Sequence, residues 1–225
     1  MVHYGGPFSM HTYSHRRIFA YCWALYARNA PFLIGLFISL WAFVVGTQFL
    51  ALVLFREVSM MTGIAVALFG WIFTTVLGMG ILYIIVKLAR KESVRHEDLL
   101  TPAPALVRYI GASFLYHIIV TLGFLFFIVP GFVLAIKYMF YRHLIVDQDL
   151  DVFEALYVSG CMTEGSKLRL FGLSLLLSCV NLLGLLAFGV GLLITVPYTM
   201  LILARVYERE LIELKRRMRH DTHMP

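Results

Sequence analysis

The sequence predicts an all-α protein: a polytopic membrane helical bundle of six transmembrane helices arranged as three hairpins, with an N-terminal interfacial helix and a cytoplasmic amphipathic helix. Three observations lead to this fold class. Of the 225 residues, 60% are hydrophobic and only 14% are charged, whereas soluble domains carry about 25% charged residues. Apolar runs of span length alternate with short polar or Gly/Pro-containing segments. Basic residues follow the ends of these runs, as the positive-inside rule expects.

The whole chain, residues 1–225, is expected to form one integral membrane domain. Residues 1–30 would supply a tail and an interfacial helix, in which basic and aromatic side chains are mixed as at the headgroup level. Residues 31–204 would form the six-span bundle, and residues 205–225 a charged cytoplasmic helix and tail. The N-terminus lacks an apolar stretch followed by a small-residue cleavage site, so we expect no cleaved signal peptide.

The first predicted hairpin joins residues 31–55 to residues 61–86. Each run exceeds the roughly 20 residues that cross a hydrocarbon core, and Pro31 suits the first turn of a new helix. Small residues recur on one face of each run and predict close helix contact. They are Gly35, Ser39, Ala42 and Gly46 in the first run, and Gly70, Thr74 and Gly78 in the second.

The second predicted hairpin is shorter on its returning side. Residues 109–129 form the third span, and a tight turn is expected at Pro130-Gly131. The fourth span, residues 132–146, would be only about 22 Å long at 1.5 Å per residue. Either the hairpin tip lies below the far surface, or the helix continues past Asp147.

A cytoplasmic amphipathic helix is predicted over residues 152–164, between the second and third hairpins. Asp151 and Glu154 resemble a capping box at its start, and Gly165 suits its end. Its expected apolar side holds Val152, Phe153, Leu156, Tyr157 and Met162, while Asp151, Glu154 and Glu164 would face water. Residues 170–188 then form the fifth span, and the sixth runs through Pro197 to Ala204.

The distribution of basic residues predicts the orientation. With six spans and both ends on one side, that side holds all of the 19 Lys and Arg except Arg56. The positive-inside rule therefore places both termini in the cytoplasm, for a multi-pass protein of the inner membrane.

An internal repeat relates the last two hairpins. Residues 108–127 and 169–188 share eight of twenty positions, including Arg108 with Arg169, Gly111 with Gly172, Ser113 with Ser174 and Gly123 with Gly184. The third and fifth spans are thus predicted to be equivalent starts of parallel hairpin repeats, an arrangement that some transporters also use.

Residues 125–208 contain a further pattern. It comprises Pro130-Gly131, Lys137-Tyr138, Asp147, Ala155, Ser159, Met162, Gly165, Lys167, Arg169 to Phe171, Gly189, Gly191 and Pro197-Tyr198. In these residues the chain resembles a bacterial integral membrane family of uncharacterised proteins (domain of unknown function 975), which is related to the glycerophosphoryl diester phosphodiesterase membrane domain. The resemblance implies a helical membrane architecture and carries no activity with it. No phosphodiesterase catalytic domain accompanies it.

Lys137 is the first candidate for a polar or lipid-contacting site, since charges inside a membrane are costly and usually functional. Its ammonium could contact an anion, a lipid headgroup or an ion path, or it could extend to water or to backbone carbonyls. The acids are all placed outside the spans, so we expect its partner among backbone carbonyls, Asn181, Ser174, Ser178 or a lipid phosphate.

Two polar faces and one basic surface complete the candidates. Ser174, Ser178 and Asn181 share a face of the fifth span, and Ser113 and His117 share one of the third. With Lys137 these faces could line a hydrated cavity, although such stripes more often hold helices together. Further candidates for contact with anionic headgroups at the cytoplasmic face are Arg142, Lys167 and Arg169, with His143 beside them.

Motifs of enzymes, metal sites and cofactor sites are absent from the sequence. The histidine pairs of the tails (His11 with His15, His220 with His223) lack supporting ligands, and the three cysteines lack metal spacing. We expect no catalytic residue, no cofactor and no nucleic-acid partner.

Two functions remain open. The first is a non-enzymatic scaffold, accessory or regulatory membrane module, whose partners are membrane lipids and an unidentified membrane protein contacting the helix 152–164. The second is a small permease or lipid/ion pathway lined by Lys137, His117 and Asn181.

Overall fold

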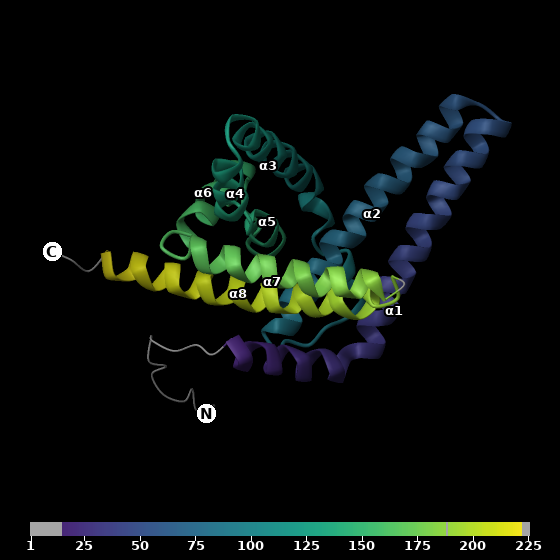
Figure 1. Ribbon diagram of the computed structural model, residues 1–225. Helices are drawn as coiled ribbons and strands as arrows, with labels where there is room; N and C mark the ends of the chain where they lie inside the picture. The colour runs from purple at the N-terminus through teal and green to yellow at the C-terminus, as the bar shows by residue number, and fades with distance from the viewer. Residues whose placement is uncertain (1–14, 188, 222–225) are drawn as a thin grey trace.

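The computed structural model describes residues 15–187 and 189–221, and these are almost entirely helical, without a strand (Figure 1). The elements are α1 (His15–Glu57), α2 (Met60–Ala89), η1 (His96–Leu99), η2 (Ala103–Ala105), α3 (Leu106–Phe126), α4 (Ile128–Lys137), α5 (Tyr141–Gln148), α6 (Val152–Met162), α7 (Lys167–Leu186) and α8 (Leu192–Asp221).

Five helical stretches are long and apolar enough to cross a membrane. They are Ile18–Glu57, Met60–Ala89, His96–Phe126, Ile128–Gln148 and Lys167–Leu186. The prediction of an all-helical, multi-pass chain is therefore confirmed. The predicted sixth span falls in α8, which is not one of these five stretches, because its apolar first half passes directly into a charged second half.

α1 is one helix of 43 residues, and the predicted boundary at Pro31 is wrong. A proline inside a helix removes one hydrogen bond and bends the helix without necessarily ending it. Figure 1 shows the result: the first part of α1 lies beside α8, and the rest turns away to pair with α2.

The α1/α2 contact uses fewer small residues than the sequence suggested. A Cβ on Gly63 or Gly70 would stand within 3.0 Å of Phe55 or Thr47 on α1, so α2 approaches α1 closely at these two glycines. Gly35 and Gly46 have no heavy atom within 4 Å of an added Cβ, and the predicted small-residue face of α1 therefore lies away from its neighbours.

The turn between α3 and α4 lies at Phe127, a few residues before the predicted position at Pro130-Gly131. Phe127 is the extended residue between the helices, with φ −159° and ψ 149°, and Pro130-Gly131 belongs to the first turns of α4. Proline fits a first helical turn because the amide hydrogen that it lacks has no intrahelical partner there.

The predicted fourth span is broken. α4 ends at Lys137, α5 begins at Tyr141, and the helical stretch then continues past Asp147 to Gln148. The break contains neither glycine nor proline, the residues that most often interrupt a helix, since Lys137, Tyr138 and Phe140 lie there. The break is set instead by contacts with α6, described below.

α6 ends at Met162, two residues before the predicted end, and the predicted capping box is wrong because the Asp151 side chain makes no cap hydrogen bond. Its buried side is made of Ala155, Leu156, Ser159, Gly160 and Met162. Phe153 and Tyr157 lie on the other side and are 77% and 74% exposed. The predicted apolar side is thus divided between the protein core and the outer surface.

The two hairpins of the sequence repeat share one feature of packing. Gly123 of α3 lies against Gly131 of α4, and Gly184 of α7 lies against Gly191 and Thr195 at the start of α8. Gly123 and Gly184 occupy the same position in the repeat, and at each of them the returning segment of the hairpin leaves no room for a Cβ. The returning helices differ, with 10 residues in α4 and 30 in α8.

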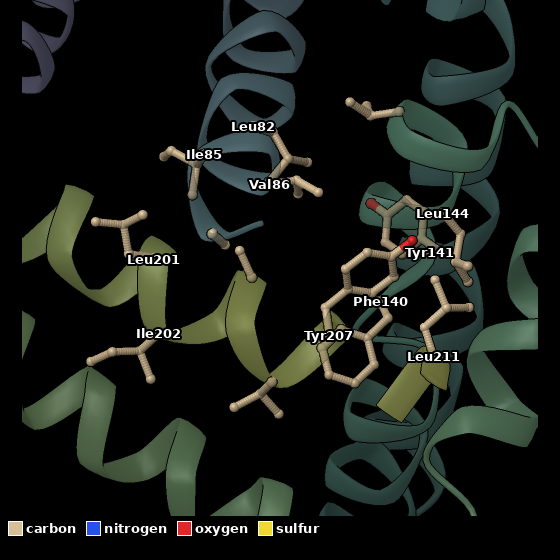
Figure 2. Packing of buried hydrophobic residues seen from close by; sticks show 14 of the residues in the cluster. Leu82, Ile85, Val86, Phe140, Tyr141, Leu144, Leu201, Ile202, Tyr207 and Leu211 are labelled. Carbon is tan, nitrogen blue, oxygen red and sulfur yellow. The ribbon is translucent and has the colours of Figure 1, made fainter. Parts of the chain in front are cut away.

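The buried core gathers where α2, α5 and α8 meet (Figure 2). Its central part comes from the last turns of α2, most of α5 with the preceding Phe140, and the middle of α8. The labelled residues are Leu82, Ile85, Val86, Phe140, Tyr141, Leu144, Leu201, Ile202, Tyr207 and Leu211. By contrast, large apolar side chains are exposed along α1, α2, α3 and α7, where lipid would cover them.

Candidate functional site

A buried ionic cluster joins the three helices that build the core. The Arg90 guanidinium, at the end of α2, makes two bonds to the Asp147 carboxylate of α5, at 2.5 and 2.7 Å, and one through Nε to Glu208 of α8. The Tyr207 hydroxyl and the Gln148 amide also donate to Asp147, at 2.8 and 2.7 Å. We call these five residues the Arg90 cluster.

The Arg90 cluster is enclosed and fully paired. The side chain of Asp147 is 1% exposed, that of Glu208 14% and that of Arg90 25%. Burial works against the charge of Arg90, but hydrogen bonds to Asp147 and Glu208 outweigh it and raise the pKa of the guanidinium. Burial, reinforced by the charge of Asp147, also raises the pKa of Tyr207, which remains a neutral donor. Such an arrangement binds α2, α5 and α8 together.

His143 lies one turn before Asp147 on α5 and continues the enclosed region. Its ring stacks on Tyr207 with centroids 5.0 Å apart, and Phe140 meets it edge to face at 5.9 Å. The side chain is almost completely buried, and neither ring nitrogen has a hydrogen-bond partner among the described residues. His143 therefore fills the core and does not reach the lipid surface where the sequence analysis placed it.

A second ion pair fixes the segment after α2. The Lys87 ammonium contacts both carboxylate oxygens of Asp98 at 2.8 and 2.9 Å, and Asp98 also accepts from the Arg95 backbone amide at 2.7 Å. Next to it, Leu99 lies directly against Gly80 of α2, where there is no room for a Cβ. The loop is thus held tightly to the last turns of α2.

The break between α4 and α5 is closed by hydroxyl groups of the helix that follows. The Lys137 carbonyl, released from helical bonding, accepts from Ser159 Oγ and Thr163 Oγ1, each at 3.1 Å. The Phe140 amide donates to Ser159 Oγ at 3.2 Å. Ser159 and Thr163 are fully buried, so the backbone groups at the break are satisfied inside the protein.

The Lys137 side chain has an aromatic partner that the sequence analysis did not include. Its ammonium lies 5.2 Å from the centroid of the Tyr138 ring, within the range of a cation–π interaction. Its aliphatic part passes over Gly160, where an added Cβ would stand 3.0 Å from Lys137 Cε. The residue is half-buried at the edge of α6.

His117 and the α3 face belong to a separate group of polar contacts. His117 Nδ1 lies 2.5 Å from the Ser113 carbonyl oxygen of its own helix, and the His117 side chain is exposed. The Ser113 hydroxyl accepts from Tyr141 at 3.0 Å, and Tyr141 accepts from Arg142 Nε at 2.8 Å. The guanidinium of Arg142 also lies 5.9 Å from the Tyr109 ring centroid. This chain of contacts ties α3 to α5.

Asn181 holds the third hairpin together. Its amide nitrogen donates to Thr199 Oγ1 of α8 at 3.2 Å. Ser174 is half-buried and Ser178 is exposed on the same helix. Asn181 thus has the role of interhelix contact, and within the described residues no hydrogen bond joins it to Lys137 or His117.

The basic residues at the start of α7 lie at the surface. Lys167 is half-buried and Arg169 is exposed, beside Leu168, which is 85% exposed. Close by, Ser166 donates to the buried Glu210 of α8 at 3.5 Å. Burial raises the pKa of Glu210, and the charge of Glu213 adds to this effect.

Within residues 15–187 and 189–221, histidine, cysteine and acidic side chains form no group that could hold a metal ion. His11 and His223 lie outside this part of the chain, so the structure does not describe the histidine pairs of the two tails.

The described geometry indicates the class of this protein: a multi-pass helical membrane protein with a buried ion-pair cluster at one end of the bundle. No family model, curated protein or solved structure matches the chain.

Proposed function

We propose that the chain is a non-enzymatic scaffold, accessory or regulatory module of the inner membrane. The observation that carries this proposal is the closed break beside Lys137. A discontinuous helix opens backbone groups to a ligand in transporters, whereas here Ser159 and Thr163 occupy those groups. The interior is used for holding helices together.

The proposal includes six spans with both termini in the cytoplasm. The supporting observations are the basic asymmetry of the sequence and the placement of the Arg90 cluster, which collects the ends of α2 and α5 and the charged half of α8 at one end of the bundle. α8 would cross as its apolar first half and leave the membrane where its charges begin.

Membership of the resembled bacterial family is likewise proposed. Several residues that carry the resemblance have structural work in this chain: Lys137 and Ser159 form the closed break, Asp147 binds Arg90, and Gly165 adopts a positive φ of 79°. A pattern of this kind is explained by the helical architecture alone and requires no catalytic activity.

The second candidate is a small permease or lipid/ion pathway. The discontinuity of α4 and α5 beside a charged residue favours it, because ion and substrate sites in transporters lie at such interruptions. Lys137, His117 and Asn181 would line the pathway, although each now contacts a different neighbour.

Reconstituted vesicles separate the two candidates. Purified protein would be placed in liposomes loaded with reporters of potassium, proton and chloride movement. The module predicts leakage equal to that of protein-free liposomes, for wild type and for Lys137→Met alike. A wild-type flux that Lys137→Met abolishes would replace the module with the pathway.

The face of α6 that points away from the protein core is the proposed surface for a membrane-protein partner, since Phe153 and Tyr157 are exposed on it at one end of the bundle. A photo-crosslinking amino acid at position 153 or 157 in cells should give one common protein adduct. Position 71 in α2, where Trp71 is 53% exposed, is the control for lipid-facing aromatics. Identical adducts at all three positions would contradict the proposed surface.

A further inference from the structure

Three elements bring two cations onto one tyrosine at the cytoplasmic end of the bundle. The ring of Tyr21, in the first part of α1, has the Arg205 guanidinium of α8 at 4.4 Å from its centroid and the Lys91 ammonium at 5.4 Å. Figure 1 shows this part of α1 running beside α8. Residues from positions 21, 91 and 205 of the chain therefore converge on one small region.

The two cations of this region have no carboxylate partner among the described residues. Among the described residues, neither Lys91 nor Arg205 forms an ion pair, and the Tyr21 hydroxyl is buried without a hydrogen-bond partner. The nearby carboxylate of Glu208 is occupied by Arg90. Two neighbouring cations without an ion pair form a set that an anion with several oxygens would satisfy.

The backbone of Lys91 points the same way. Lys91 follows the C-cap of α2 with φ 62°, its amide donates to Leu88, and the Glu92 amide donates to Lys87. These two bonds define a Schellman motif, and its left-handed position is normally filled by glycine. A lysine is strained in this left-handed conformation, and at this position it places an ammonium group beside the Tyr21 ring, which glycine could not do.

The surroundings indicate a lipid source for the anion. Lys91 stands two residues after Ala89, where the apolar stretch of α2 ends. Trp23 is 52% exposed and packs edge to face on Tyr198 at 5.6 Å, next to the same part of α1. Exposed tryptophan and tyrosine beside basic residues are typical of the level of lipid headgroups.

We propose that Lys91 and Arg205, which lie together on the Tyr21 ring, bind the phosphate of an anionic phospholipid. Both cations contact the phosphate oxygens. A zwitterionic headgroup fits less well because its own cation is repelled by the two basic side chains. This inference rests on the proposed membrane placement of the bundle and is independent of its scaffold role.

Lipid titration of delipidated protein in detergent tests the proposal. The melting temperature would be followed by tryptophan fluorescence while dioleoylphosphatidylglycerol or dioleoylphosphatidylcholine is added. The anionic lipid should raise the melting temperature more than the zwitterionic one. Lys91→Gly and Arg205→Gln should each increase the half-saturating concentration of anionic lipid about fivefold, the fold-change equivalent to about 1 kcal/mol per basic residue.

The variants separate binding from folding. Lys91→Gly relieves the left-handed strain, so lipid-free protein should melt no lower than wild type while its lipid response weakens. Tyr21→Phe keeps the ring on which both cations lie, and should keep the lipid response. Lys215→Gln changes one exposed lysine of α8 outside the site and should behave as wild type.

Two results would overturn the proposal. One is an unchanged lipid response in Lys91→Gly. This result would refute the proposal even if Arg205→Gln did not fold. The other is inorganic phosphate alone reproducing the whole stabilisation, because the lipid assignment would then be wrong. The vesicle-flux and α6 cross-linking experiments do not depend on the lipid response. The lipid site and the scaffold role can therefore be refuted independently of each other.

Discussion

Replacing Asp147 by asparagine should reveal how much the Arg90 cluster contributes to stability. Asp147→Asn removes the charge that makes two bonds to Arg90 and leaves the guanidinium with Glu208 alone. Removing one partner of a buried pair costs about 3–5 kcal/mol. Because Glu208 still neutralises Arg90, we expect the lower end, about 3 kcal/mol of unfolding free energy.

The matched control lies two residues away. Asp149 also pairs with an arginine, Arg108, but its side chain is 77% exposed. Asp149→Asn is the same chemical change, and asparagine tolerates the left-handed conformation of that position, φ 55°. An exposed pair is worth about 0–1 kcal/mol, so the two substitutions should differ by at least about 2 kcal/mol.

Equilibrium unfolding in mixed micelles, followed by tryptophan fluorescence at increasing dodecyl sulfate fraction, would measure both. A double-mutant cycle with Arg90→Met would measure the coupling energy between Arg90 and Asp147. The double variant Arg90→Met/Asp147→Asn should lose about 2 kcal/mol less unfolding free energy than the sum of the two single losses. Equal losses for Asp147→Asn and Asp149→Asn would refute the reasoning that Asp147 is an enclosed partner of Arg90.

Three further predictions concern topology, packing and pH. Reporter fusions after Arg56 and after Gly189 should both lie on the outer side, and a cytoplasmic signal at either point would contradict the six-span arrangement. Gly80→Ala should destabilise the protein by about 1–3 kcal/mol because the methyl group meets the η1 backbone, whereas Gly78→Ala, with open space around it, should be neutral or stabilising by up to about 1 kcal/mol in the same unfolding assay. Burial raises the pKa of Glu210 above the ordinary value of 4.5, so the folded state holds this proton more tightly than the unfolded state, and stability should fall as pH rises above that value. Glu210→Gln should flatten that decline in unfolding free energy, and an unchanged slope would show that other groups cause it.

The helices could be predicted from the sequence because apolar length is a local property. Runs of 20 or more apolar residues leave few alternatives in a membrane. Errors arose where helix ends depend on neighbours. Pro31 bends α1 without ending it, and the break after Lys137 depends on Ser159 and Thr163, which lie more than twenty residues later.

The Arg90 cluster escaped prediction for a related reason. Arg90 and Asp147 each follow an apolar run and were interpreted as ordinary charges at helix ends. Their pairing joins residues 57 positions apart, and Glu208 is 118 positions from Arg90. One signal was present in the sequence: acidic residues are scarce in this chain, Asp147 directly follows one apolar run, and Glu208 lies four residues after the end of another. Acids in that position require a cationic partner, and Arg90 is available at the end of α2.

The separation of these partners along the chain has a consequence for biosynthesis. Glu208 follows Arg90 by 118 residues. Because ribosomes add about 5–20 residues per second, Glu208 is added roughly 6–24 s after Arg90. During this interval α2 is already long enough to enter the membrane, and Arg90 stands at its end without its final partner. The insertion machinery or the headgroup layer must therefore shelter that charge until Asp147, 57 residues after Arg90, becomes available, and the second carboxylate arrives only with α8. Chains interrupted before α8 would hold Arg90 on Asp147 alone and would lack the part of the core that α8 supplies.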